Sequence, residues 1–248
     1  MKVLATYSIK GGVGKTSAAV NLGALAAKEG RRTLIWDLDP QGAASFLFRI
    51  KPRVKGGAGK LIRGKRDPSA ALKGTDIEGL DLLPADFSYR HLDLVLDARR
   101  RPLDALASVL DALRDQYDVV ILDCAPSISL VSESVFRASD LLLVPVVPAT
   151  LSVRTFEQLQ AFLDGQDGDA PDVLAFLSMV DRRKRLHRDL VIELPQQLPA
   201  VATAVVPAAS VVERMGLERE PVVCSAPRSP AAKAYVTLWA EVSERLLG

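Results

Sequence analysis

The sequence predicts an α/β fold in which one mostly parallel sheet is covered by helices on both faces, and two observations support this. Short apolar runs alternate with helix-length segments, which is the pattern of buried parallel strands joined by helical crossovers. With 248 residues, 48% of them hydrophobic, the chain can bury one full core. We therefore expect a single domain over residues 1–248.

The apolar runs and the segments between them place the elements along the chain. Strands are expected at 2–8, 32–37, 79–84, 118–123, 140–146, 173–179 and 201–206. Helices are expected at 16–29, 88–97, 102–115, 128–138, 151–164, 183–194 and 230–246. Gly30 is placed to end the first helix. The segment 51–74 departs from this rhythm, because it holds eight Lys and Arg residues among glycines, and we expect a flexible basic insertion with room for one short helix.

A glycine-rich turn follows the first expected strand and leads into the first expected helix. It reads Lys10-Gly11-Gly12-Val13-Gly14-Lys15-Thr16-Ser17. Glycines let backbone N–H groups approach phosphate oxygens, and the positive N-terminus of the next helix faces the same anion. In such a loop the final lysine reaches the β- and γ-phosphates, and the hydroxyl after it ligates Mg²⁺. The sequence therefore predicts a nucleoside triphosphate site at Lys15 and Thr16.

Lys10 makes this motif more specific, because an ordinary P-loop needs only the final Lys-Thr pair. With it the chain resembles the ParA/MinD group of P-loop ATPases, whose deviant Walker A fingerprint is Lys-Gly-Gly-x-Gly-Lys-Thr. The resemblance implies a P-loop NTPase fold, ATP and Mg²⁺ as ligands, and slow ATP hydrolysis. It also implies that Lys10 crosses the interface of an ATP-bound homodimer to the partner's nucleotide phosphates. The alternative is a solvated loop lysine.

Two carboxylates stand at the end of the second expected strand, in the run Asp37-Leu38-Asp39-Pro40-Gln41. Open α/β sheets bind ligands at the carboxyl ends of their strands, so both acids are expected beside the P-loop. In the resembled family this segment is switch I. By that match Asp39 orients the attacking water, with Lys10 and Lys15 as the other catalytic residues, and Asp37 supports Mg²⁺ or its water shell. Alternatively, both acids only cap the junction between strand and loop.

The run Asp118-Val119-Val120-Ile121-Leu122-Asp123 has the Walker B form of four apolar residues closed by an acid. Together with the P-loop it predicts that Asp123 holds Mg²⁺ opposite Thr16. The next residues, Cys124-Ala125-Pro126-Ser127, are similar to the family's switch II. We expect Cys124 to be a small buried residue.

Later segments extend the resemblance over most of the chain. Met179-Val180-Asp181-Arg182 is similar to a motif after the family's sixth strand, and Val206-Pro207 begins a segment that surrounds adenine in relatives. By this match Met179 and Pro207 bind the nucleotide. Ala208 and Ala209 depart from the pattern, because these positions are usually polar or basic in the family. A preference for ATP over GTP is therefore implied by the family likeness alone.

A basic run follows this motif and contains Arg182, Arg183, Lys184, Arg185 and Arg188. ParA-type relatives bind duplex DNA without sequence preference through such side chains, in a salt-sensitive contact with phosphates. The resemblance implies these five as the DNA-binding residues, and we expect His187 to belong to the same patch. The alternative is a solvated helix start, and the basic loop 51–66 is a second place for DNA.

Composition and the C-terminal segment bear on the class of function. A net charge of +2 gives no general affinity for nucleic acid, and the two cysteines have neither disulfide nor zinc spacing. We find no signal peptide and no apolar run long enough for a bilayer, so we expect a cytoplasmic protein without membrane attachment. Apolar residues recur at helical spacing in 230–246 between charges of both signs, which predicts a helix docked on the core.

The resemblance implies an ATPase that dimerises with ATP, associates with the nucleoid, and segregates or positions a plasmid, a chromosome or a large protein cargo. Its implied partner is a ParB-like or cargo-adaptor protein that stimulates hydrolysis. Two alternatives remain open. One is a MinD-like regulator that cycles on the membrane, and the other is a metabolic enzyme of the wider superfamily.

Overall fold

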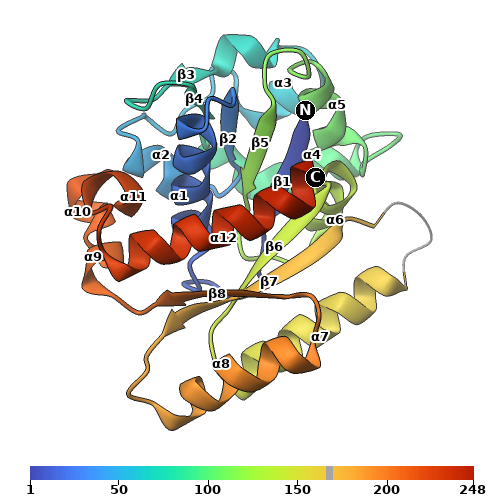
Figure 1. Ribbon diagram of the computed structural model, residues 1–248. Coiled ribbons are helices and arrows are strands. Elements are labelled where there is room, and N and C mark those ends of the chain that lie inside the picture. Colours follow the sequence, from blue (N-terminus) through green and yellow to red (C-terminus); the bar gives the residue numbers. More distant parts are fainter. Residues whose placement is uncertain (166–169) are drawn as a thin grey trace.

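The computed structural model describes residues 1–165 and 170–248, which form one sheet with helices on both of its faces (Figure 1). In this described part the strands are β1 (Lys2–Thr6), β2 (Thr33–Asp37), β3 (Lys73–Gly74), β4 (Leu80–Leu83), β5 (Val119–Asp123), β6 (Leu141–Val146), β7 (Asp172–Val180) and β8 (Val201–Pro207). Their order in the sheet is β3-β4-β2-β5-β1-β6-β7-β8. Every neighbouring pair is parallel except β3 with β4. The predicted α/β fold with a mostly parallel sheet is confirmed.

The helices form two layers. They are α1 (Lys15–Lys28), α2 (Ala43–Leu47), α3 (Gly57–Ile62), α4 (Leu92–Asp97), α5 (Ala105–Asp111), α6 (Leu130–Ala138), α7 (Thr150–Asp164), α8 (Arg185–Gln197), α9 (Ser210–Glu213), α10 (Met215–Glu218), α11 (Val222–Ser225) and α12 (Pro230–Leu247), with 3₁₀ turns η1 (Pro68–Ala71) and η2 (Phe87–His91). Side chains of α1, α2, α11 and α12 pack on one face of the sheet. Those of α3 to α8 pack on the other face.

The central strands are buried on both sides, because successive side chains of a strand point to opposite faces. In β1, Leu4 packs on the α1 side, whereas Val3 and Ala5 pack on the α6 side. In β5, Ile121 packs on the α1 side and Val120 packs on the α6 side. Such strands carry continuous apolar runs, which is why the sequence located them.

Segment 51–74, expected as a flexible basic insertion with room for one short helix, has a short helix and also packs on the core. It contains α3, η1 and β3, and Leu61 and Ile62 are 1% and 2% exposed within the core of that face. Its basic side chains lie at the surface while its few apolar residues fill the layer over the sheet. The segment is therefore part of the domain's packing.

The C-terminal helix α12 docks on the core, as its apolar spacing predicted. Tyr235, Leu238, Trp239 and Val242 are each at most 2% exposed and pack in the same cluster as α1. Figure 1 shows α12 crossing the molecule beside α1 and β8. None of the described helices is long and apolar enough to cross a membrane.

Both edges of the sheet are restricted. At one edge β3 contributes only two residues. At the other edge Glu241 of α12 accepts hydrogen bonds from the backbone N–H groups of Thr203 (2.8 Å) and Ala204 (2.9 Å) in β8. The same carboxylate accepts a bond from the Thr203 hydroxyl at 2.9 Å.

Candidate functional site

The glycine-rich turn connects β1 to α1 in the conformation that a phosphate cradle requires. Gly12 and Gly14 have φ of 70° and 100°, values that residues with side chains rarely adopt. A Cβ at Gly14 would also lie 2.8 Å from Ser178 Oγ, so both space and backbone angle select glycine there. Gly14 is the residue before α1, so the free N–H groups of the first helical turn face the loop.

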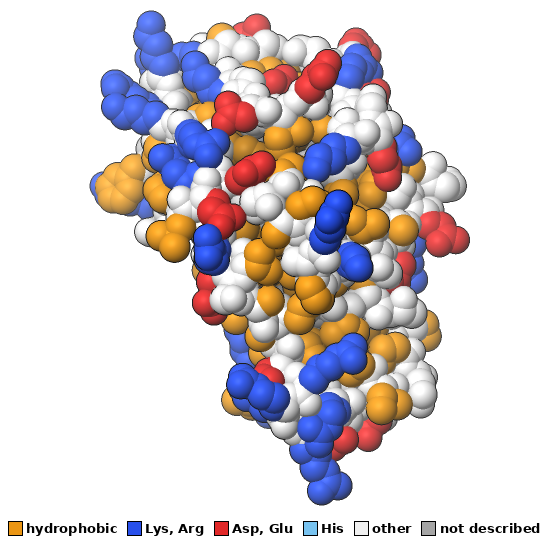
Figure 2. All heavy atoms as spheres, turned by 60° about the vertical axis from the view of Figure 1, so that its left-hand side comes forward, with side chains coloured by type: hydrophobic (Ala, Val, Ile, Leu, Met, Phe, Trp, Pro, Cys, Tyr) orange, Lys and Arg blue, Asp and Glu red, His pale blue; other side chains and the backbone are white. Residues whose placement is uncertain are grey.

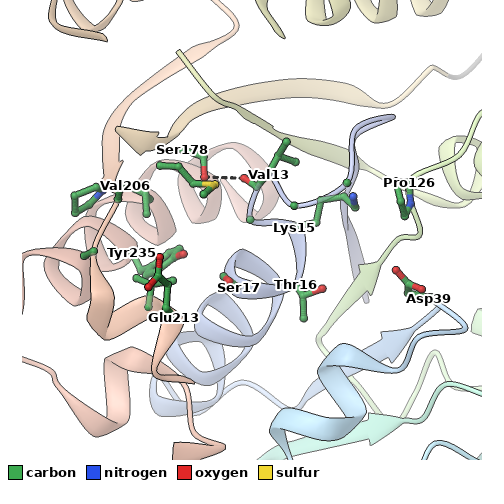
Figure 3. Close-up of a pocket in the computed structure, with 18 residues that line it drawn as sticks. Val13, Lys15, Thr16, Ser17, Asp39, Pro126, Ser178, Val206, Glu213 and Tyr235 are labelled. Carbon is green, nitrogen blue, oxygen red and sulfur yellow. Dashed lines mark hydrogen bonds between the residues drawn. The ribbon is translucent and has the colours of Figure 1, made fainter. Parts of the chain in front are cut away.

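A cavity of about 420 Å³ opens over this turn. Its lining comprises Gly11, Gly12, Val13, Gly14, Lys15, Thr16, Ser17, Asp39, Pro126, Ser178, Met179, Val206, Pro207, Ala208, Ala209, Val212, Glu213 and Tyr235. Figure 3 shows its two ends: Lys15, Thr16 and Asp39 lie together at one end, and Glu213 and Tyr235 lie at the other. The cavity therefore joins a charged end that suits phosphates to a more apolar end that suits a base.

Lys15 is buried at the charged end and is held by the loop itself. The side chain is 7% exposed, and its Nζ donates to the carbonyl oxygen of Lys10 at 3.0 Å. Burial lowers the pKa of Lys15, while the nearby carboxylates of Asp123 and Asp39 act in the opposite direction. The cation is thus placed where phosphate oxygens would replace a backbone carbonyl as its partner.

Asp123 ends β5 beside Thr16 and gives the clearest indication of a cation site. Its side chain is fully buried, and its Oδ2 has no hydrogen-bond partner among the described residues. Burial, and then repulsion from Asp37, raises the pKa of Asp123 to about 8. Oδ1 accepts a bond from the Thr6 hydroxyl at 3.4 Å, but a buried carboxylate with one oxygen unpartnered is costly unless something positive neutralises it. Oxygen donors are what Mg²⁺ prefers, so Asp123 and Thr16 fit the predicted metal site.

The described residues contain no cluster of three or more His, Cys, Asp or Glu side chains that could hold a metal ion alone. In nucleotide sites Mg²⁺ commonly takes one or two protein ligands, and phosphates and water complete its coordination.

Asp37 is hydrogen-bonded to the segment that follows its strand. Its Oδ2 accepts hydrogen bonds from the Ser45 backbone N–H (2.8 Å) and hydroxyl (2.7 Å), and its Oδ1 accepts one from the Asp39 N–H at 3.3 Å. Burial raises its pKa to about 6 despite these bonds. These bonds hold α2 and the strand end in place, and a role of Asp37 in supporting Mg²⁺ or its water shell stays a prediction.

Asp39 lies two residues further on and lines the cavity. It is partly exposed, and its Oδ1 accepts the N–H of Gln41 at 2.9 Å. This leaves Asp39 at the charged end, on the side opposite the base-sized region (Figure 3).

The other end of the cavity is built from β7, β8, α9 and α12. Met179 and Pro207, which the sequence assigned to the nucleotide, both line it. Met179 has a φ of 56°, an unusual value for a residue with a side chain, and is 42% exposed. Just before it, Ser178 donates to the Val13 carbonyl at 2.8 Å and so ties β7 to the glycine-rich turn.

Sequence reasoning did not assign Ser178, Val212 or Tyr235 to the site. Tyr235 was interpreted only as part of the apolar face of α12, yet its hydroxyl forms a hydrogen bond with Ser17. Burial raises the pKa of this tyrosine well above its usual range. A hydroxyl among aliphatic residues on a helix face was the one available signal.

Lys10 lies outside the cavity lining. Its Nζ donates to the Ser152 hydroxyl of α7 at 3.3 Å, and its backbone N–H donates to Ser8 Oγ at 3.2 Å. It is thus the one lysine of the motif that does not point into the cavity of its own chain.

The predicted basic run lies at the start of α8, and its five basic residues are exposed. Figure 2 shows Lys and Arg side chains gathered at the lower end of the molecule, where α8 lies in Figure 1. Acids neutralise part of this charge: Arg183 Nε is 2.9 Å from Asp181 Oδ1, and Arg185 Nε is 3.6 Å from Asp189 Oδ2.

His187 was wrongly expected to join this patch. It is 7% exposed, and its Nδ1 accepts the backbone N–H of Asp181 at 3.0 Å. The ring therefore closes the turn beneath the exposed basic side chains.

Comparison with known proteins places the chain in a family. A family model described as an AAA domain matches residues 1–167. The chain is 30% identical to the sporulation initiation inhibitor protein Soj of Bacillus subtilis, over 98% of each chain. The chain belongs to the ParA/MinD-type family of P-loop ATPases.

Two further relatives of this ParA/MinD-type chain are informative. The chromosome partitioning protein ParA of Caulobacter vibrioides is 29% identical over 99% of this chain and 95% of its own. A structure of cobyrinic acid a,c-diamide synthase from Mycobacterium smegmatis with bound ATP analog and magnesium is 30% identical, with a TM-score of 0.79 over 98% of this chain and 94% of that one.

Proposed function

We propose that this ParA-like ATPase binds ATP with Mg²⁺ in the cavity over the glycine-rich turn. It uses ATP hydrolysis to segregate or position a large cargo. The observation that carries the proposal is the two-ended cavity, which has Lys15 and Thr16 at its phosphate end and Met179 and Pro207 at its base end. The Mycobacterium smegmatis relative was solved with an ATP analog and magnesium, which supports the same ligands here.

In this proposal the chain's own residues divide the work of phosphoryl transfer. Lys15 neutralises the β- and γ-phosphates, Thr16 and Asp123 hold Mg²⁺, which neutralises the phosphate charge that develops, and Asp39 orients the attacking water. Asp37 contributes indirectly, because its bonds to Ser45 and to the Asp39 N–H fix the segment that carries Asp39.

We propose that the ATP-bound form is a homodimer and that Lys10 contacts the partner's nucleotide. The position of Lys10 supports this, because its side chain points toward α7 rather than into its own cavity. Two apposed lysines repel each other unless anionic phosphates lie between them, so the γ-phosphate of ATP favours the dimer over the ADP form.

We propose that the dimer binds duplex DNA without sequence preference through Arg182, Arg183, Lys184, Arg185 and Arg188, and so associates with the nucleoid. Arg182 and Lys184 form no ion pair with the acids that the structure describes, whereas Arg183 and Arg185 each share charge with an aspartate. Each neutralised phosphate changes the slope of log affinity against log salt by about −0.9, so doubling the patch in a dimer strengthens binding steeply.

The Caulobacter relative is named for chromosome partitioning, which supports a plasmid, chromosome or protein cargo and an adaptor of the ParB kind that stimulates hydrolysis. A MinD-like membrane cycle is less well supported, because the apolar face of α12 is packed on the core. The likeness to a diamide synthase makes ATP-dependent amide formation a second candidate.

ATP binding and turnover in two variants test the proposal. Lys15→Ala should weaken the binding of a fluorescent ATP analogue by about tenfold or more, because a hydrogen bond to a charged group is lost. Asp39→Ala should keep the affinity and lose hydrolysis. Equal loss of binding in both variants contradicts these roles, and turnover that requires a carboxylic acid and an amine favours the second candidate.

A further inference from the structure

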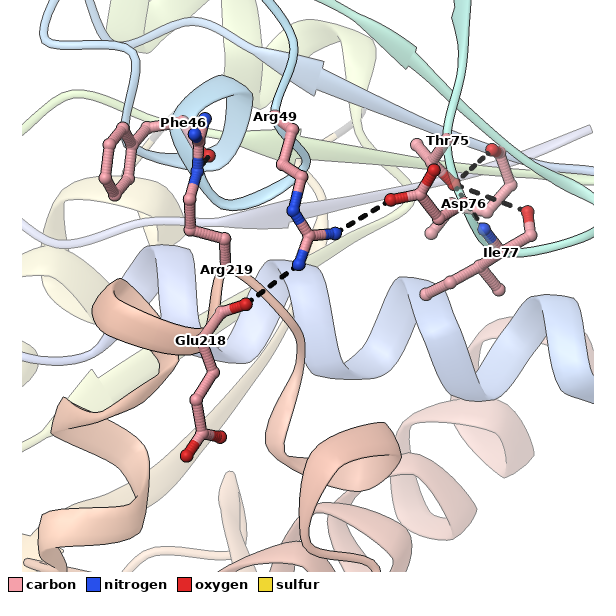
Figure 4. A network of polar contacts seen from close by, with 8 residues as sticks. Phe46, Arg49, Thr75, Asp76, Ile77, Glu218 and Arg219 are labelled. Atoms are coloured by element: carbon pink, nitrogen blue, oxygen red, sulfur yellow. Dashed lines mark hydrogen bonds and ion pairs between the residues drawn. The ribbon is translucent and has the colours of Figure 1, made fainter.

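Two arginines hold α2 against the segment that follows the base end of the cavity (Figure 4). Arg49 donates from Nη2 to the carbonyl oxygen of Glu218 at 2.9 Å, and its Nη1 is 2.8 Å from Asp76 Oδ2. Arg219 donates from Nε to the carbonyl oxygen of Phe46 at 2.9 Å, and its guanidinium lies 4.4 Å from the centre of the Phe46 ring. Each arginine therefore bonds to the backbone of the other segment.

Both arginines occupy a backbone conformation that favours glycine. The φ angles are 59° at Arg49 and 54° at Arg219. A residue with a side chain in this region carries strain, and such strain persists only where the surrounding contacts fix it. The reciprocal bonds between the two segments are the contacts that offset it here.

The α2 side of this contact leads directly to the charged end of the cavity. Ser45 in α2 bonds to Asp37 through its N–H and its hydroxyl, and Asp37 in turn accepts the N–H of Asp39. Phe46, which follows Ser45 in α2, supplies the carbonyl oxygen that accepts the bond from Arg219. Helix α2 is thus fastened to Asp37 at one side and to Arg219 at the other.

The Arg219 side leads to the base end. Val212 and Glu213 of α9 line the cavity, and α10 follows them and ends at Glu218. Arg214 stiffens this short path, because its Nε donates to Glu218 Oε1 at 3.0 Å and its N–H donates to the Ser210 carbonyl at 2.8 Å. A base that contacts α9 therefore contacts the same short segment, 210–219, that Arg49 and Arg219 connect to α2.

We infer that Arg49 and Arg219 are positioning residues that join the base end of the cavity to the Asp37–Asp39 segment, so that a bound base fixes Asp39 for catalysis. They act through α2 and touch neither the cavity nor the metal site. The inference rests on the proposed ATP site and names how one end of that site controls the other.

The test compares kcat for ATP at saturation with the affinity for Mg²⁺ and inorganic tripolyphosphate, which has no base. Arg219→Gly removes the clasp and suits the backbone angle, so it avoids the strain that Arg219→Ala would keep. We expect kcat to fall about tenfold, the loss of one charge-assisted hydrogen bond, while tripolyphosphate affinity stays within about twofold.

Arg49→Gly should give the same loss, and the double variant should lose little more than either single variant, because the two side chains act as one clasp. Asp76→Ala is the matched control: it removes one partner of Arg49 but leaves the bond to the Glu218 carbonyl, so kcat should stay within about twofold.

An unchanged kcat in both glycine variants, or equal losses of kcat and tripolyphosphate affinity, overturns the inference, because either result makes the clasp a purely structural contact. A wild-type protein that neither binds nor hydrolyses ATP refutes the proposed function instead, so the two failures are distinguishable.

Discussion

Replacing Asp123 by Asn should make the ligand-free protein less sensitive to pH. Asp123 is fully buried without a partner for Oδ2, and its pKa is raised to about 8. In the unfolded chain an aspartate ionises near pH 4. Between these values the folded state holds one more proton than the unfolded state, so the free energy of unfolding falls as pH rises.

The size of the effect follows from one proton. Its slope is about 1.4 kcal/mol per pH unit, so between pH 5 and pH 7 the wild type should lose up to about 2.7 kcal/mol more than Asp123→Asn. For a domain of this size that difference is about 5–10 °C in Tm. Asp37, with a pKa of about 6, also makes the free energy of unfolding fall as pH rises. It does so in both proteins, so its contribution largely cancels from the difference between them.

Urea unfolding at pH 5, 6 and 7, without nucleotide or Mg²⁺, measures this difference. Asp118→Asn is the control, because Arg32 lowers the pKa of exposed Asp118 to about 2 and neither state of that group titrates in the window. Adding ATP with Mg²⁺ should flatten the wild-type curve if the cation neutralises Asp123. Parallel curves for the wild type and Asp123→Asn without ligand would refute the reasoning.

Three further predictions concern the proposed cycle. Lys10→Ala should bind ATP with wild-type affinity. In the Asp39→Ala background, which we expect to dimerise with ATP and not with ADP, adding Lys10→Ala should give a monomer in sedimentation. An ATP-dependent dimer of this variant would exclude Lys10 from the interface. Replacing Arg182 and Lys184 by Glu should abolish binding to random-sequence duplex DNA and leave dimerisation intact. Gel retention at two salt concentrations measures this binding. Undiminished binding would place the DNA site elsewhere, and the basic loop 51–66 would be the next region to test. Tyr235→Phe should lower the free energy of unfolding by about 1 kcal/mol, because the bond to Ser17 is lost, and equal urea midpoints would contradict it.

The sequence located the seven long strands because each is a buried apolar run, and periodicity found the long helices. It missed β3, since two residues carry no pattern, and it missed α2, α9, α10 and α11, which have four or five residues each. The segment expected as one helix at 88–97 is a 3₁₀ turn followed by α4. Helix α8 runs to Gln197 through Pro195, which lies in its last turn, beyond the expected end at 194.

For the site, the sequence was most informative where the chain is local. Most of the phosphate end is one continuous turn, residues 11–17, so the sequence shows its motif directly. The base end draws single residues from β7, β8, α9 and α12, and only the fold brings Ser178 or Tyr235 to the same cavity. The left-handed backbone at Met179 and the bond of buried His187 to the Asp181 N–H likewise follow no pattern that the sequence shows.

The carboxylate of Glu241 has a consequence for aggregation, because it covers part of an outer strand. A bare outer strand invites another chain to add to the sheet, and such growth has no natural end. Here the two backbone donors of β8 at Thr203 and Ala204 are already taken. At the opposite border β3 offers too little backbone to template a neighbour. Both borders of the sheet are therefore poor templates for strand-by-strand polymerisation of crowded copies.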